Sequence, residues 1–450
     1  MDGFVLEGYK RVYFAGIGGV SMSALALILR SRGIAVLGCD RSHSHETEIL
    51  EQSGVLVEYD ETRPSLGNVD LLVYTAALKP DHPVLVKAAA AGIKCISRAE
   101  LLGAVIRDYK ISIGVSGTHG KSTTSGLISR IADVTPGHDP SFAVGALLPF
   151  VNAYYKVGTD DTFIFEADEY KDSFLRFYPT TAVVLNVCHD HPDYFKDLSQ
   201  VVRSFAEYMS HSQKAVVNLE SDGAVRSAYR YKGELAWFSH IRKADYYAAD
   251  ITEENGYYSY ILCHPQGETP VTLSIPGRHN VSNSLAAFAA CHLNGFAPEE
   301  IAAGIRSFTG VARRFERIGE LNGAQVISDY AHHPDEIAAT LDTAASLKPR
   351  RVITVFQPHT YSRLADLYGK FCETLSKSDI LAVTDVFSAR ETDTRSVSGE
   401  KLALSCGGVY APDFAYAADF LRSTAGPGDL VIIMGAGDIY KVWDELQKTS

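Results

Sequence analysis

The fold of the middle of the chain is decided by one stretch, Ile111-Ser112-Ile113-Gly114-Val115-Ser116-Gly117-Thr118-His119-Gly120-Lys121-Ser122-Thr123. Its first half is an apolar run of the kind that forms a buried strand, and its second half is a glycine turn that opens a helix from Lys121 to about Ala132. Glycines let backbone N–H groups turn toward an anion, and the N-terminus of a helix adds its positive dipole end. The stretch therefore predicts a phosphate-binding loop for ATP or GTP.

Two side chains of this loop carry specific expectations. Lys121 is expected to bridge the β- and γ-phosphates, and the hydroxyl of Ser122 is expected to hold Mg²⁺. Valine occupies position 115, where the strict P-loop motif has glycine. The alternative is a glycine–serine turn that only caps a helix, but the preceding strand favours the phosphate loop.

Two other strand–loop–helix openings divide the chain into three α/β units. The first opens at Arg11 and the last follows Gly310-Val311-Ala312. Strands that alternate with helices predict parallel, doubly wound sheets, Rossmann-like in the first and last units and P-loop ATPase-like in the middle. Short alternating runs from Tyr246 to Ser274 suggest an antiparallel flank on the middle sheet. The expected domains are 1–107, 108–312 and 313–450.

Bulk composition agrees with this division and excludes some classes of protein. At roughly 150 residues per domain, 450 residues suggest three domains. A net charge of −12 argues against nucleic acid or an anionic membrane surface as the main partner. The seven cysteines are scattered without a Cys-x-x-Cys pair, and neither a signal peptide nor an apolar run of about 18 residues is seen. We expect a cytoplasmic protein with reduced thiols and no membrane insertion.

A glycine cluster follows the first strand. Gly16-Ile17-Gly18-Gly19 is similar to a dinucleotide fingerprint, and Asp40 ends the next strand, where an acidic residue would bond a ribose hydroxyl. Taken alone, this region leaves a nicotinamide-dependent oxidoreductase open. The same turn would bind a nucleoside diphosphate through the same contacts between its phosphates and the backbone N–H groups.

Acidic and histidine residues follow two later strands of the middle unit. Phe165-Glu166-Ala167-Asp168-Glu169 ends one of them, and Asn186-Val187-Cys188-His189-Asp190-His191-Pro192-Asp193 ends another. In an open parallel sheet such strand ends surround the ligand crevice. Carboxylate and imidazole groups there suit Mg²⁺ on a nucleotide. Solvated loop charges are the alternative.

The last unit repeats this pattern on two strands. Asp329-Tyr330-Ala331-His332-His333-Pro334 and Phe356-Gln357-Pro358-His359-Thr360-Tyr361-Ser362-Arg363 both stand at expected strand ends, with Pro334 at a helix start. We interpret them as a binding site rather than as two surface turns. The linker pair Arg313-Arg314 is expected to reach a phosphate, with an exposed linker as the alternative.

With these residues assembled, the chain resembles the Mur ligases of peptidoglycan synthesis over nearly its full length, and within them the alanine-adding member. The resemblance rests on nine motifs that occur in family order: GIGGVSMS from Gly16, GTHGKSTT from Gly117, EADEYKDSFL from Glu166, DHPDYF from Asp190, GRHNVSN from Gly277, Arg313 to Phe315, DYAHHP from Asp329, FQPHTYSR from Phe356, and MGAGDI from Met434.

The resemblance implies a reaction of three substrates, ATP, UDP-N-acetylmuramate and L-alanine, with Mg²⁺ as cofactor. The muramate carboxylate attacks the γ-phosphate to give an acyl phosphate and ADP, and the alanine amine then displaces phosphate. Such enzymes serve cell-wall biogenesis, on which cell shape and division depend. A monomer or a homodimer is expected.

The resemblance also assigns roles to residues. The ATP-binding set is Gly117, Thr118, His119, Gly120, Lys121, Ser122, Thr123, His279, Asn280, Asn283, Arg314 and Asp329. The UDP-sugar set is Gly16, Ile17, Gly18, Gly19 and Asp40. The metal ligands are Ser122, Glu166 and His191. The catalytic set is Lys121, Glu166, His191, His333 and Arg363, of which the last two would hold the incoming amino acid.

The chain departs from the family at one informative position. Thr360 stands where the family often has a second arginine for the amino-acid carboxylate, which leaves Arg363 as the anchor. Since Lys196 and Lys214 have no lysine between them, the carbamylated lysine of several related ligases is not expected here. A murein recycling ligase, which joins a preformed peptide to the same UDP-sugar, stays open, as do the oxidoreductase and a non-enzymatic nucleotide-gated binding protein.

Overall fold

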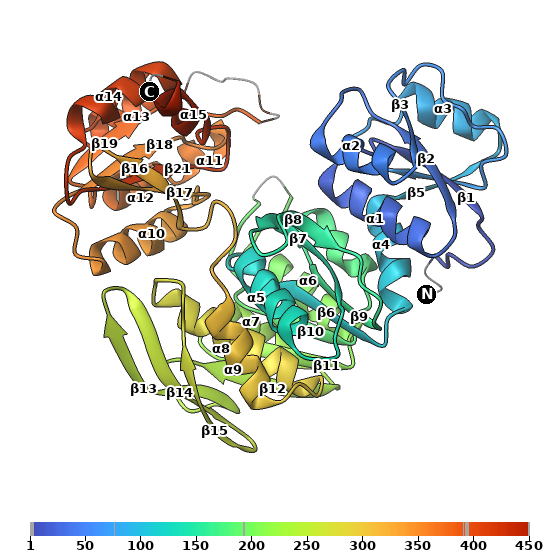
Figure 1. The fold of residues 1–450 in the computed structure, drawn as a ribbon, viewed down its shortest axis with the longest axis horizontal. Helices are drawn as coiled ribbons and strands as arrows, with labels where there is room; N and C mark the ends of the chain where they lie inside the picture. The colour runs from blue at the N-terminus through green and yellow to red at the C-terminus, as the bar shows by residue number, and fades with distance from the viewer. Residues whose placement is uncertain (1–3, 76, 192–193, 390, 392–395, 449–450) are drawn as a thin grey trace. The chain divides into compact units, whose positions relative to one another are not determined.

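The computed structural model describes residues 4–75, 77–191, 194–389, 391 and 396–448. Pro192 and Asp193 of the Asp190–Phe195 motif lie outside these ranges. The chain forms a three-domain α/β fold with three separate sheets, coloured blue, green to yellow, and orange to red in Figure 1. It divides into two compact units: residues 1–248, 262–269 and 283–305 form the first, and residues 249–261, 270–282 and 306–450 form the second.

The first sheet is Rossmann-like, as predicted. Its strand order is β3-β2-β1-β4-β5 and all its pairings are parallel. Alternate side chains face opposite helix layers: Val12 and Phe14 pack in one core and Tyr13 and Ala15 in another. Its elements are β1 (Arg11–Ala15), α1 (Val20–Ser31), β2 (Ala35–Cys39), α2 (His45–Gln52), β3 (Leu56–Glu58), β4 (Leu71–Tyr74), α3 (Pro83–Ala90), β5 (Lys94–Ser97) and α4 (Arg98–Arg107).

The central sheet has the order β15-β14-β13-β12-β11-β10-β6-β9-β7-β8. It is parallel from β13 to β7, and β7 and β8 pair antiparallel. Strands β13, β14 and β15 are joined to one another by turns too short for parallel neighbours. The predicted antiparallel flank is thus confirmed.

The elements of this middle region follow the chain in the order β6 (Ile111–Ser116), α5 (Lys121–Val134), β7 (Ser141–Leu148), β8 (Ala153–Lys156), β9 (Thr162–Glu166), the 3₁₀ helix η1 (Tyr170–Arg176), β10 (Thr181–Val184), α6 (Leu198–Ser210), β11 (Lys214–Asn218), α7 (Asp222–Ala228), β12 (Glu234–Ser239), β13 (Tyr246–Glu254), β14 (Tyr257–His264), β15 (Gly267–Thr272), α8 (His279–Leu293) and α9 (Pro298–Ser307).

The third sheet has the order β16-β17-β21-β18-β19-β20, parallel except for the β16–β17 pair. Helices cover both faces: α10, α12 and α13 pack against one, and α14 and α15 against the other. Its elements are β16 (Glu316–Leu321), β17 (Ala324–Asp329), α10 (Pro334–Ser346), β18 (Val352–Phe356), α11 (Tyr361–Asp366), α12 (Tyr368–Leu375), β19 (Ile380–Val383), α13 (Gly399–Ser405), β20 (Val409–Tyr410), α14 (Phe414–Thr424), β21 (Leu430–Met434) and α15 (Lys441–Gln447).

The registers of the sheets place the functional loops. Parallel pairing sets Val115 of β6 opposite Glu166 of β9, and Ser116 opposite Val184 of β10. In the third sheet, Asp329, Met434 and Phe356 lie at one level. The phosphate loop, the acidic cluster after β9, and the motifs that begin at Asp329, Phe356 and Met434 therefore stand at the carboxyl ends of parallel strands, where ligand crevices form.

Candidate active site

The phosphate loop runs from the end of β6 to the start of α5, and its two glycines are sterically required. Gly117 has φ +140° and Gly120 has φ +85°, a backbone conformation that side chains rarely adopt. A Cβ atom at Gly117 would lie 3.0 Å from the Cβ of Leu185, and one at Gly120 would lie 2.8 Å from the Oδ1 of Asn283. The backbone of the loop thus packs closely against its neighbours.

Asn186, which follows β10, holds the loop in shape. Its Oδ1 accepts the backbone N–H of His119 at 2.8 Å, and its Nδ2 donates to the carbonyl of the same residue at 3.0 Å. Its own carbonyl accepts the N–H of Thr118 at 3.1 Å. Asn186 was part of a predicted cluster but had no predicted role, because its spacing from the loop in sequence gives no sign of this contact.

Lys121 begins α5 and its ammonium group is held at the loop. Nζ donates to the carbonyl of Gly117 at 2.6 Å and to Glu169 Oε2 at 2.9 Å. The side chain of Glu169 is 3% exposed and that of Lys121 17%. Burial opposes the charge on Lys121, but the neighbouring carboxylates, Glu169 foremost, outweigh it and raise the pKa of the lysine above its ordinary value. Lys121 is therefore a fixed cation next to the phosphate loop.

Carboxylate and imidazole groups gather beside this lysine. One ligand atom each from Asp168, Glu169 and His191 lies within 4.8 Å of the others. His191 adopts φ +55°, and its backbone N–H donates to the Oδ1 of Asp190 at 2.7 Å. The sequence predicted that the two clusters surround one crevice, but it assigned only Glu166 and His191 from them to a metal and gave Asp168 and Glu169 no role of their own. Their place directly after Glu166 was the available signal.

The other two predicted metal ligands lie on β9 and α5. Glu166 ends β9, and its Oε1 accepts the N–H of Gly145 at 2.6 Å and faces the hydroxyl of Ser125 at 3.5 Å. Ser122 is 7% exposed in the first turn of α5. Glu166 and Ser122 as metal ligands stay predictions.

The glycine turn of the first sheet is bonded to the neighbouring strand. The N–H groups of Gly16 and Ile17 both donate to the carbonyl of Cys39 at 2.9 Å. Asp40 Oδ2 accepts the N–H of Gly18 at 2.9 Å, so this carboxylate shapes the turn itself. Gly19 precedes α1, whose first turn lacks a side-chain cap. A contact of Asp40 with a ribose stays a prediction.

In the second unit, a buried carboxylate and an arginine come together near the start of the third sheet. Asp329 is 6% exposed, and it accepts the N–H groups of Phe315 and Ala331, both at 2.7 Å. Burial raises its pKa although the charge of Arg314 acts to lower it. Burial together with the charge of Arg314 lowers the pKa of His279 to about 4. Asp329, Arg314 and His279 thus form one electrostatic group.

The two predicted asparagines lie in α8 next to tight backbone. Asn280 donates from Nδ2 to the carbonyl of Pro276 at 2.7 Å. Asn283 lies against Gly120 of the phosphate loop, and the two asparagines are 6% and 9% exposed. Arg313 serves a different purpose from its neighbour Arg314: its Nη2 donates to the carbonyls of Gly435 and Gly437 at 2.6 and 3.0 Å. Arg313 is therefore a structural residue of the third sheet.

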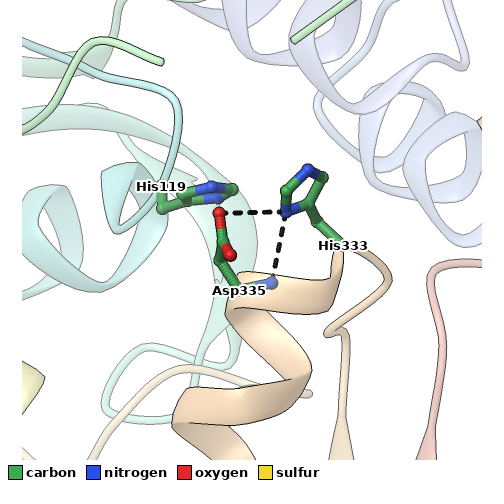
Figure 2. A group of neighbouring side chains, drawn as sticks. All are labelled: His119, His333 and Asp335. Atoms are coloured by element: carbon green, nitrogen blue, oxygen red, sulfur yellow. Dashed lines mark hydrogen bonds and ion pairs between the residues drawn. The ribbon is translucent and has the colours of Figure 1, made fainter. Parts of the chain in front are cut away.

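His333 is the N-cap of α10. Figure 2 shows its ring above the first turn of the helix, where Nδ1 accepts the backbone N–H of Asp335 at 3.3 Å. The carboxylate of Asp335 lies 3.5 Å from the same nitrogen. The ring of His333 is thus held at the start of α10.

Arg363 lies in α11 among two histidines that the sequence did not single out. Its Nη1 is 3.4 Å from the Nδ1 of His359, and the rings of His332 and His359 are 5.4 Å apart. Burial, with the charge of Arg363 acting in the same direction, lowers the pKa of each histidine to about 4. Glu391 accepts the N–H groups of Tyr361 and Ser362 at the start of this helix. The guanidinium thus stands beside two neutral imidazoles.

A phosphate loop, a cluster of lysine, carboxylate and histidine groups, and three α/β sheets define a nucleotide-using enzyme. Comparison with known proteins identifies the family to which this enzyme belongs. The chain matches the Mur ligase family, catalytic domain at residues 11–110, the Mur ligase middle domain at 115–291 and the Mur ligase, glutamate ligase domain at 313–437. The chain belongs to the Mur ligase family, whose members are ATP-dependent amide ligases. This membership removes the nicotinamide oxidoreductase and the non-enzymatic binding protein as alternatives.

Relatives of this family match the chain from end to end. It is 42% identical to UDP-N-acetylmuramate–L-alanine ligase of Lachnospira eligens over 97% of this chain and 98% of the relative. It is 40% identical to the ligase of that name from Acetivibrio thermocellus, over 98% and 96%.

Solved structures of the family share the fold. UDP-N-acetylmuramate–alanine ligase of Thermotoga maritima superimposes with a TM-score of 0.81 at 23% identity, over 97% of this chain and 98% of the other. A murein peptide ligase of Psychrobacter arcticus gives 0.70 at 22%, over 98% of both chains. Within the described part of the chain, no helix has the length and apolar character needed to cross a membrane.

Proposed function

We propose that this protein joins L-alanine to the carboxylate of UDP-N-acetylmuramate, with ATP as co-substrate and an acyl phosphate as intermediate. The observation that carries the proposal is the ammonium group of Lys121, fixed 2.9 Å from Glu169 beside a phosphate loop, with Glu169 itself grouped with Asp168 and His191. Full-length identity of about 40% to relatives named as L-alanine ligases supports the choice of substrates.

The phosphoryl step falls to the first unit. Backbone N–H groups of the loop and Lys121 would hold the β- and γ-phosphates, and the lysine offsets charge that develops on the transferred group. The acceptor carboxylate forms a bond to the γ-phosphorus while the bond to the β-phosphate oxygen breaks and ADP leaves. The UDP part of this substrate is proposed to bind Gly16 to Gly19, with Asp40 nearby.

Mg²⁺ is proposed as the cofactor, since the donors present suit a hard cation. Carboxylate oxygens of Asp168 and Glu169 and a ring nitrogen of His191 lie within reach of one ion, and Glu166 and Ser122 are the further proposed ligands. When bound, Mg²⁺ supplies neutralisation of phosphate charge. Because Glu169 already pairs with Lys121, Asp168 and His191 are the better placed of the three.

The amide step falls to the second unit. Arg363 would pair with the carboxylate of the amino acid, and His333 would contact it. The amine then attacks the acyl carbon, and phosphate leaves with the electrons of the broken C–O bond. Neutral His332 and His359 beside Arg363 keep the site at a single positive charge. His279, Asn280, Asn283, Arg314 and Asp329 are proposed to contact the base, ribose and phosphates of the nucleotide.

The test is phosphate release from ATP with UDP-N-acetylmuramate and each of the twenty amino acids, and separately with the peptide that a recycling ligase would use. Release with L-alanine well above the other amino acids is the expected result. Release with the peptide alone would replace this proposal by the recycling activity. A chelator should abolish release and added Mg²⁺ should restore it.

Further parts of the proposal concern organisation. The domain limits are placed near residues 107 and 312, and a cytoplasmic monomer or homodimer is proposed for cell-wall precursor synthesis. Scattering with and without substrates tests whether the domains close during the reaction, because three separately folded domains must serve one reaction centre. Unchanged radii of gyration would argue against closure.

A further inference from the structure

Two cysteines face each other across a helix pair in the second unit. Cys372 lies on α12 and Cys406 is the C-cap of α13. One helical turn before Cys372, the hydroxyl of Tyr368 lies 2.9 Å from the hydroxyl of Ser405, the neighbour of Cys406. Since positions four apart share a helix face, this bond turns the face of α12 that carries Cys372 toward the end of α13, where Cys406 lies. Both cysteines also pack at the edge of the same hydrophobic core.

The thiol of Cys372 lies close enough to that of Cys406 to act on it electrostatically. Burial, and next the hydrogen bond with Cys372, raise the pKa of Cys406 to about 12. Cys406 therefore keeps its proton. Cys372 is thus the sulfur on which a thiol reaction begins.

Partial exposure distinguishes this pair from the buried cysteines of the chain. Cys39 and Cys291 are 0% exposed and Cys263 is 8% exposed. Cys372 and Cys406 both retain intermediate exposure in the folded protein. Partial exposure, proximity and a second thiol that holds its proton favour a dithiol that closes on itself.

We propose that Cys372 and Cys406 form a reversible dithiol–disulfide pair that exchanges with small disulfides of the glutathione class. The thiolate of Cys372 attacks one sulfur of the small disulfide, the S–S bond breaks, and one small thiolate leaves and takes up a proton. Cys406 then loses its proton and its sulfur attacks that of Cys372, which expels the second small thiol. Two protein thiols are oxidised to one disulfide while the small disulfide is reduced to two thiols.

The disulfide would tie α12 to α13 and enclose residues 373–405. This segment contains Glu391, which caps the start of α11, the helix of Arg363. Closing such a loop stabilises a fold chiefly by restricting the unfolded chain. The pair goes beyond the proposed ligase activity and is measured without it.

The experiment equilibrates the native full-length protein with buffers of rising oxidised-to-reduced glutathione ratio, then blocks free thiols and digests with trypsin under non-reducing conditions. Cleavage after Lys370, Lys377, Lys401 and Arg422 yields peptides 371–377 and 402–422, each with one cysteine. The expected product is these two peptides joined, with a mass lower by two hydrogen atoms than their sum. Cys95→Ser, another partly exposed cysteine, is the matched control and should leave the linkage unchanged.

Single variants test the order of events. Cys406→Ser should accumulate one glutathione on Cys372, whereas Cys372→Ser should leave Cys406 largely unmodified. In the wild type, the oxidised form should unfold about 5 °C above the reduced form. Glutathione added independently to both cysteines without the linked peptide, linkage seen only in denaturant, or equal unfolding temperatures would each overturn the proposal.

Discussion

Replacing Lys121 by methionine should separate its catalytic contribution from its structural one. In sequence terms a loop lysine near phosphates is expected to matter for turnover with little effect on the fold. The structure changes the second half of that expectation, because Nζ lies 2.9 Å from Glu169, whose side chain is 3% exposed. Lys121→Met leaves that carboxylate buried without its cation.

The size of the loss follows from this burial. Removing one partner of a buried ion pair costs about 3 kcal/mol or more of unfolding free energy. For a domain of this size that lowers the unfolding midpoint by about 6 to 12 °C. Burial raises the pKa of Glu169 above its ordinary value even though Lys121 acts to lower it. Without the lysine this pKa rises further, so the deficit is smaller below the unfolded value, near 4.5, and grows as pH rises. Turnover should fall by at least about 10²-fold.

Calorimetry from about pH 5 to 8 and phosphate-release assays check these values. The second variant, Lys121→Met with Glu169→Gln, should recover most of the stability but none of the turnover, since it removes the unpaired charge and not the catalytic defect. A single variant as stable as wild type at every pH, or a double variant less stable than the single one, would refute the reasoning.

Three further predictions concern other parts of the site and fold. Asn186→Ala should raise the KM for ATP about tenfold by freeing the phosphate loop, with Asn218→Ala as the control that leaves it unchanged. Because the pKa values of His332 and His359 are about 4, the KM for L-alanine should show no inflection near pH 6.5, and such an inflection would contradict their neutrality. Arg350 and Arg351 lower the pKa of Asp429. The ionised carboxylate therefore adds to the free energy of unfolding above its unfolded pKa of about 3.8, and this contribution is lost as pH falls toward the lower pKa of the folded state. In calorimetry, Asp429→Asn should lower the unfolding midpoint at neutral pH and weaken the decline of that midpoint in acid.

The strand ends were the most predictable part of this protein. A phosphate loop, an acidic cluster and two histidine-rich turns each stand after an apolar run, and the rule for parallel sheets places all of them at crevices. Periodicity failed where a helix changes direction: the run from Ser362 to Leu375 predicts one helix, but the structure has α11 and α12, which meet at Leu367. The apolar residues of α11 and α12 follow the same spacing, so the hydrophobic periodicity gives little sign that the helix is interrupted at Leu367.

Local sequence determined the three α/β units, the glycine turns and Lys121, because these depend on the order of apolar, glycine and charged residues along a few turns of chain. Tertiary structure alone decided which groups meet. Glu169 beside Lys121, Asn186 on the phosphate loop, and His332 beside His359 are contacts between segments far apart in sequence. Strand order decides which of these groups meet, and burial together with neighbouring charges sets the charge of each group. The spacing of residues along the chain determines neither.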